Sequence, residues 1–123
     1  MYKMEDLDIY PTWADCAEDI ENMMRFQCLV TGLQKHCLEN LQYPEVARKS
    51  GAREAAIMLR VVIGPTGKVV EAKVARSLGE DEVSKAFERE AIRVVKSSPD
   101  MIPGQIGGQS ASTELMFPIR FIP

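Results

Sequence analysis

The residues of this chain with the most reactive side chains are one histidine and three cysteines. His36 stands beside Cys37, and Cys16 and Cys28 lie upstream. A catalytic thiol needs a base within hydrogen-bond reach, but neighbouring residues on a helix project about 100° apart. Cys37 also falls on the apolar face of the helix expected around it, which favours a place in the core. We therefore predict that the chain is not an enzyme.

Metal and phosphate sites are also disfavoured. The cysteines are scattered and lack the Cys-x-x-Cys spacing of many zinc sites, so we predict no metal and no cofactor. The glycine-rich stretch GQIGGQ, at residues 104–109, precedes an expected strand. A phosphate-binding loop instead opens a helix, whose first N–H groups hold the anion.

The redox state of the cysteines is left open by the residues themselves. Composition slightly favours three reduced cysteines that act as small apolar residues. Cys28 and Cys37 are nine positions apart in one expected helix, so they lie on opposite sides and cannot pair within a straight helix. Cys16 precedes that helix, and a bridge between Cys16 and Cys28 is geometrically possible.

Composition is that of an ordinary globular domain. The chain has 123 residues, of which 46% are hydrophobic and 27% charged, and its net charge is -3. This charge gives no electrostatic reason to expect nucleic acid or an anionic membrane as a partner. No apolar run approaches the roughly 18 residues of a membrane span. The acidic, mixed N-terminus is not a signal peptide, so any targeting segment would have to lie upstream.

Apolar periodicity predicts an α+β domain, residues 42–123, behind an N-terminal helical extension, residues 1–41. In the extension, apolar residues recur at three- and four-residue steps from about residue 18 to residue 41. In the domain we expect a short helix, a two-stranded hairpin, a longer helix and a final strand, at 44–50, 55–63 with 68–77, 81–98 and 113–122.

The final strand, which reads TELMFPIRFIP with the last residue of the chain, contains a proline at its centre. We predict a three-stranded antiparallel sheet in the order 68–77, 55–63, 113–122, with the helices packed on one face. Pro118 cannot donate to a sheet ladder, so its flank of the strand should be the outer one. That flank would then offer the N–H groups of Met116 and Arg120. Pro118 could equally serve only to prevent aggregation at the edge.

Several short motifs follow one another across residues 42–122, about two-thirds of the chain. They are Gln42-Tyr43-Pro44 with Ala47-Arg48 and Gly51, the hairpin with Gly67 at its turn, EAIRVVKSSP, IPG at 102–104 and PIRF at 118–121. In this order and spacing they resemble the C-terminal domain of TonB, the energy transducer of Gram-negative envelopes.

The resemblance implies a periplasmic domain, tethered to the inner membrane by an N-terminal helix and a Pro-rich linker. That helix would engage the ExbB–ExbD proton-driven motor, and the domain would couple the proton motive force to nutrient import. It would bind the Ton box of an outer-membrane transporter by pairing it with the free edge of the final strand. The residues implied in this contact are Glu114, Met116, Pro118 and Arg120, with Gln42, Tyr43 and Pro44 beside them.

Each of these residues also has a simpler interpretation. Arg120 could pair with an acidic residue of the peptide or be a solvated edge charge. Packing and helix initiation explain Tyr43 and Pro44 as well as a docking role does.

The region before Tyr43 resembles an extension found in one branch of the family, in which a Tyr/Phe-Pro element precedes two cysteines. Cys16 and Cys28 match those cysteines, so the resemblance implies a Cys16–Cys28 disulfide in an oxidising periplasm. Two alternative functions remain. The domain could be an interaction or sensing module of a membrane metallopeptidase-like receptor, or its edge could pair with a second copy to give a homodimer.

Overall fold

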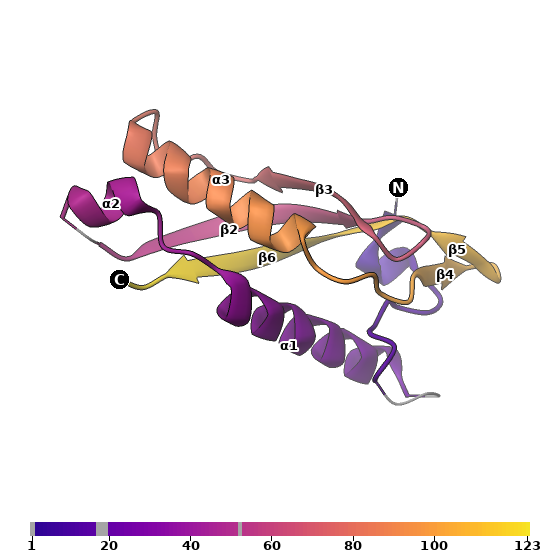
Figure 1. The fold of residues 1–123 in the computed structure, drawn as a ribbon. Coiled ribbons are helices and arrows are strands. Elements are labelled where there is room, and N and C mark those ends of the chain that lie inside the picture. The colour runs from indigo at the N-terminus through magenta and orange to yellow at the C-terminus, as the bar shows by residue number, and fades with distance from the viewer. Residues whose placement is uncertain (1, 17–19, 52) are drawn as a thin grey trace.

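A mixed four-stranded sheet runs through the molecule in the order β1-β6-β2-β3 (Figure 1). The structure is a computed structural model that describes residues 2–16, 20–51 and 53–123. The strands of the sheet are β1 (Tyr2–Lys3), β2 (Ala55–Ile63), β3 (Val69–Val74) and β6 (Thr113–Phe121).

Three of these strands confirm the predicted antiparallel sheet and its order. β2 lies between β3 and β6, and both pairs are antiparallel. The pairing of β2 with β6 is continuous from Ala55 opposite Phe121 to Ile63 opposite Thr113. Because side chains alternate along a strand, this register places Leu59 and Phe117, which are paired, in the core together.

The prediction that the final strand is an edge along its whole length was wrong. β1 adds a fourth strand on the outer side of β6, with Tyr2 opposite Thr113 and Lys3 opposite Glu114, and it runs parallel to β6. A strand of two residues is too short to show an alternation of apolar and polar residues, and it is held mainly through backbone atoms. No strand was therefore predicted among the amino-terminal residues.

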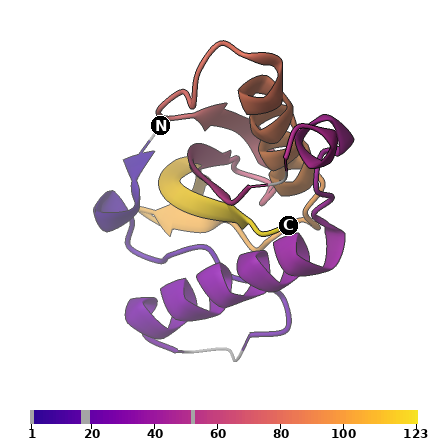
Figure 2. The same ribbon diagram turned by 90° about the vertical axis from the view of Figure 1, so that its left-hand side faces the viewer.

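Helices α1 (Asn22–Asn40) and α3 (Glu82–Lys96) supply most of the helical part of the core. In Figure 2 the C-terminal strand lies between these two helices, α1 at the bottom of the view and α3 at the upper right. Their buried side chains join the inward side chains of the strands in a single cluster. The members of that cluster from the two helices include Leu29, Leu33, Phe87, Ala91, Val94 and Val95.

Local sequence signals explain where the domain's two helices begin. α3 starts after Asp81, whose carboxylate accepts a hydrogen bond of 3.1 Å from the backbone N–H of Ser84. The Ser84 hydroxyl also donates to this carboxylate, at 2.7 Å, and of the two hydrogen bonds it contributes more to lowering the pKa of the Asp81 carboxyl. The short α2 (Glu45–Lys49) follows Pro44, which precedes its first turn.

Residues 2–16 form an arm that crosses the molecule and docks on a small ribbon. This ribbon consists of β4 (Gly104–Ile106) and β5 (Gln109–Ala111), neither of which was predicted. Ile9 donates a hydrogen bond of 3.1 Å to the carbonyl of Gln105 and accepts one of 2.9 Å from its N–H. The short 3-10 helix η1 (Met4–Asp6) connects β1 to this part of the arm.

No helix in the described ranges is both long enough and apolar enough to span a membrane.

Candidate functional site

The outer flank of β6 is divided into a covered part and an open part. At the covered part, the N–H of Tyr2 donates to the carbonyl of Ser112 at 3.0 Å, and the hydroxyl of Thr113 donates to the carbonyl of Tyr2 at 2.9 Å. After Lys3 the chain leaves the ladder and forms η1, which stays in contact with β6. Within residues 2–16, 20–51 and 53–123, no further strand pairs with this flank beyond Glu114. The open part therefore runs from Leu115 to Phe121.

Pro118 lies in the middle of the open part, with its proline nitrogen on the outer side. Its partner across the sheet is Met58, and the Met58 carbonyl accepts a hydrogen bond of 2.8 Å from the N–H of Ala75. The Met58 backbone thus faces away from β6, so Met58 and Pro118 form a pair without mutual hydrogen bonds. The N–H that proline lacks would have pointed outward. By alternation, the N–H groups of Met116 and Arg120 point outward as well.

The side chains of the predicted contact residues differ in how they are held. Met116 is 53% exposed. Arg120 is exposed and forms an ion pair of 3.2 Å with Glu54, which is exposed too. Such a surface pair contributes little stability, so an acidic group on a partner could replace Glu54 at small cost.

The carboxylate of Glu114 is already engaged within the sheet. It accepts hydrogen bonds from the guanidinium of Arg60, which also contacts Glu71 at 3.4 Å. Glu71 in turn pairs with Lys73 at 3.0 Å. The hydrogen bond from Lys73, together with the nearby Arg60 charge, lowers the pKa of the Glu71 carboxyl. These four charges form a row across three strands, so Glu114 belongs to a network that crosses the face of the sheet.

A pocket of about 360 Å³ lies beside the open part, where β1 ends. Its walls come from the arm, from α1 and from β6, and the lining residues are Lys3, Met4, Glu5, Phe26, Glu114, Leu115 and Met116. Nothing in the sequence pattern indicated this pocket, because its residues come from three segments that lie far apart along the chain.

The second predicted group of contact residues has structural roles in the fold. The ring of Tyr43 packs edge-to-face on Phe87, with centroids 5.5 Å apart, and its hydroxyl donates to the carbonyl of Arg53 at 2.6 Å. The N–H of Gln42 donates to the Glu90 carboxylate at 2.7 Å. Pro44 precedes α2. These contacts account for the three residues, and their docking role stays a prediction.

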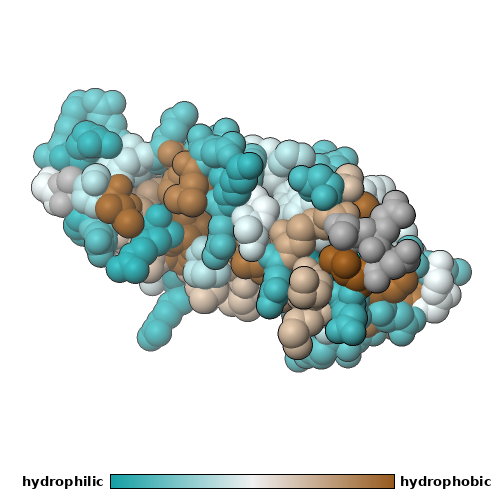
Figure 3. Space-filling view, turned by 90° about the horizontal axis from the view of Figure 1, so that it is seen from below, coloured by the Kyte–Doolittle hydropathy of each residue, from teal (hydrophilic) through white to brown (hydrophobic). Residues whose placement is uncertain are grey.

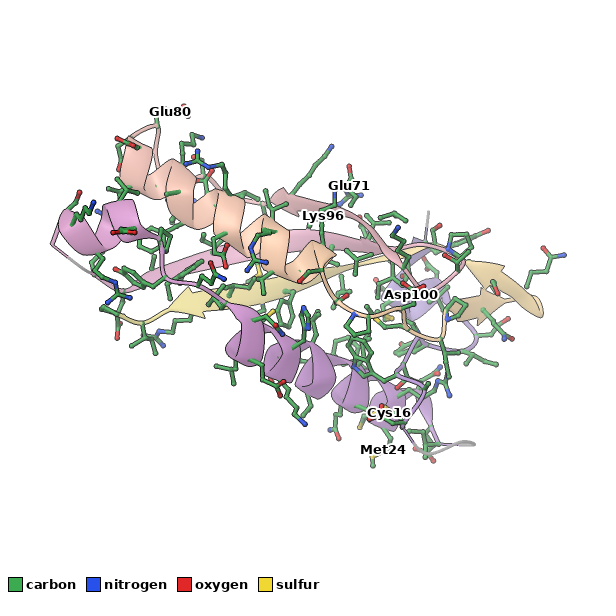
Figure 4. All side chains as sticks on the ribbon, viewed as in Figure 1. Cys16, Met24, Glu71, Glu80, Lys96 and Asp100 are labelled. Atoms are coloured by element: carbon green, nitrogen blue, oxygen red, sulfur yellow. A yellow bond between two sulfur atoms is a disulfide. The ribbon has the colours of Figure 1, made fainter. Side chains whose placement is uncertain are left out.

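Cys16 and Cys28 form a disulfide that ties the arm to α1, with their Cα atoms 6.4 Å apart. In Figure 4 the label of Cys16 lies beside the first turns of α1, near Met24. Cys37 is a free, buried thiol, and burial raises its pKa to about 11. A thiol with so high a pKa carries almost no thiolate at neutral pH and is a poor nucleophile.

His36, the neighbour of Cys37, makes polar contacts that connect two helices. Its Nε2 lies 2.9 Å from the carbonyl of Val94 and 3.1 Å from the hydroxyl of Ser97, so it joins α1 to the end of α3. In the described part of the chain, no three histidine, cysteine, aspartate or glutamate side chains are grouped closely enough to hold a metal ion.

A larger pocket of about 890 Å³ lies between the arm, α1 and the segment that follows α3. It is bordered by Trp13 of the arm, by several residues of α1 and by Pro99 and Asp100. Viewed from below, the surface shows separate hydrophobic patches surrounded by hydrophilic side chains (Figure 3).

A family model described as the C-terminal region of the Gram-negative bacterial TonB protein matches residues 39–123. This range holds β2, β3, α3 and β6, whereas the arm and almost all of α1 precede it. Comparisons with curated proteins and with solved structures gave no match.

Proposed function

The chain belongs to the family of TonB C-terminal domains, which are periplasmic and non-enzymatic, and from this premise we propose that it is the peptide-binding end of a TonB-like energy transducer. In this proposal it binds the Ton box of outer-membrane transporters. An inner-membrane helix outside the described residues connects it to an ExbB–ExbD motor, and the proton motive force drives nutrient import.

The observation that carries this proposal is the open part of the β6 flank. A sheet edge with unpaired N–H and C=O groups is the usual docking site for an extended peptide, which adds one more strand. Here the Met116 and Arg120 N–H groups point outward on either side of Pro118. Each backbone hydrogen bond contributes only about 0.5–1.5 kcal/mol net, so the contact is weak and reversible. A link that must be made and broken in every transport cycle needs these properties.

The pairing can be tested with a synthetic Ton-box peptide and backbone amide signals. We expect binding to shift the amide signals of Met116 and Arg120 strongly and those of β3 weakly. A Met116→Pro substitution removes one outward N–H and leaves the inner ladder intact, so we expect it to weaken binding by about two- to tenfold. Met116→Ala keeps the N–H and is the matched control.

The outcome also separates the alternatives. Equal affinities for Met116→Pro and Met116→Ala would contradict strand addition at this edge. Shifts at Met116 that grow with protein concentration in the absence of peptide would indicate a self-pairing homodimer. If no Ton-box peptide causes a shift at any soluble concentration, the transducer proposal is wrong, and the receptor module becomes the better interpretation.

A further inference from the structure

The pocket at the end of β1 is lined by two parts of the chain, and the family model matches only one of them. Leu115 and Met116 belong to the range that the family model matches, whereas Met4 and Phe26 precede it. The arm and α1 thus form one wall of a cavity whose other wall is the proposed peptide-binding edge. The extension is therefore placed to touch whatever binds there.

The position of the pocket defines which part of an added strand would meet it. β1 occupies the flank as far as Glu114, where Lys3 is its last paired residue. An added strand can therefore begin no earlier than opposite Leu115. Side chains of paired residues point to the same face of a sheet, so the residue opposite Leu115 points toward the helix side, into the space beside Met4 and Phe26.

The chemistry of the pocket suits an apolar side chain. Met4, Phe26 and Leu115 line it with carbon and sulfur. The charged residues in its lining are Lys3 and Glu5 of the arm and Glu114 of β6, whose carboxylate is bound to Arg60. Phe26 is 37% exposed, so a large part of its ring remains uncovered.

Phe26 is also held in place, which a selective pocket requires. Its ring packs edge-to-face on Tyr10, with the ring centroids 6.5 Å apart. Tyr10 is fixed in turn through its backbone, because its N–H donates to the Asn22 side chain at 2.9 Å and its carbonyl accepts from Arg25 at 2.7 Å. The arm and α1 thus fix the position of the ring, and the Cys16–Cys28 disulfide closes the same connection covalently.

We propose that this pocket receives an apolar side chain of the added strand, so that the N-terminal extension selects among partner peptides. The inference rests on the proposed function. The occupant is an extended peptide rather than a small molecule, because the pocket opens onto unpaired backbone groups of β6, among them the N–H of Met116. Pro118 makes a second copy of β6 a poor occupant, since each copy would lack the same donor.

The test uses blocked hexapeptides of alternating threonine and valine, together with variants in which one valine at a time is replaced by serine. With the unchanged protein, we expect one of these replacements to weaken binding about tenfold, because it removes the side chain that fills the pocket. The other replacements should have effects of threefold or less. In the Phe26→Ala protein, the sensitive position should lose its tenfold effect.

Met23→Ala is the matched control, because Met23 lies on the same helix, is 71% exposed and does not line the pocket. Its peptide discrimination should equal that of the unchanged protein. Near-ultraviolet circular dichroism checks that Phe26→Ala still folds, and Phe26→Leu, which keeps an apolar wall, should retain at least half of the discrimination.

Failure of the inference can be told apart from failure of the proposed function. If the peptides shift Met116 and Arg120 but Phe26→Ala discriminates as well as the unchanged protein, the pocket has no selective role and strand addition stands. If the hexapeptides cause no shift at these two residues but a Ton-box peptide does, the inference is overturned and the proposed function stands. If neither causes a shift, both are overturned.

Discussion

The two parts of the outer β6 flank belong to one strand, yet one part is paired with another strand and the other is not. At Ser112–Glu114 the chain pairs the flank with its own arm, and the buried hydroxyl of Thr113 adds a hydrogen bond to Tyr2. From Leu115 onward no strand lies beside this outer flank in the described structure. The inner flank has the same partner in both parts, because β2 pairs with β6 along its whole length. The comparison shows that the extension, and not the family fold, sets where the open part begins.

Removing the disulfide should have the largest effect on the arm that covers the first part of the flank. We expect the double substitution Cys16→Ser and Cys28→Ser to lower the free energy of unfolding by about 2–3 kcal/mol, because the bridge closes a loop across a sequence separation of 12. Urea denaturation measures this loss. Amide exchange should rise in the arm and stay unchanged across the β2–β6 ladder. Reduction of the unchanged protein is the control, and an unaltered unfolding midpoint in both samples would contradict the prediction.

A smaller effect is expected from Thr113→Val, which keeps the shape of the buried side chain and removes its hydrogen bond to Tyr2. We expect the attachment of β1 to weaken by about 1 kcal/mol, so that exchange of the Tyr2 amide proton speeds up roughly fivefold. Ser112→Ala is the control, since it retains the carbonyl that accepts from Tyr2. Equal exchange rates in the two variants would show that the Thr113 hydroxyl does not hold the arm.

The smallest effect concerns the row of charges behind Glu114. Hydrogen bonding from Lys73 keeps the pKa of the Glu71 carboxyl below its ordinary value in the folded protein. A lowered pKa stabilises the fold above the pKa of the unfolded chain, and this contribution is lost as the pH falls through the folded value. Between about pH 5 and pH 3, the stability of Glu71→Gln should therefore fall less steeply than that of the unchanged protein. Chemical denaturation at a series of pH values measures both slopes, and parallel slopes would exclude a role for Glu71.

The order of β3, β2 and β6 was predictable because each strand alternates strongly and Pro118 restricts the last one to an edge. Both ends of α3 were predictable, because acidic residues at its start and a proline after its end are local signals. The motifs across residues 42–122 were enough to indicate the family. These features depend on residues that are close together in the sequence.

The rest depends on contacts between distant segments. β1 is recognised only from its pairing with β6, which includes the hydrogen bond from Tyr2 to Ser112, and the pocket at its end needs Met4, Phe26 and Leu115 to meet in space. The Cys16–Cys28 pairing was one of two open alternatives from the residues alone and was favoured only through the resemblance. No periodicity in residues 1–15 could indicate that the arm would cross to the far side of β6.

Pro118 has a consequence for any complex formed at this flank. Met116 and Arg120 are four residues apart, or about 13 Å along the strand, and no amide hydrogen lies between them on the outer side. A visiting backbone that bonds to both would have one carbonyl oxygen facing the pyrrolidine ring, with no donor opposite it. That oxygen must stay hydrated. The interface between the two chains would therefore keep a hydrated break at the centre of its hydrogen-bond ladder. Water can enter at this break and separate the two chains.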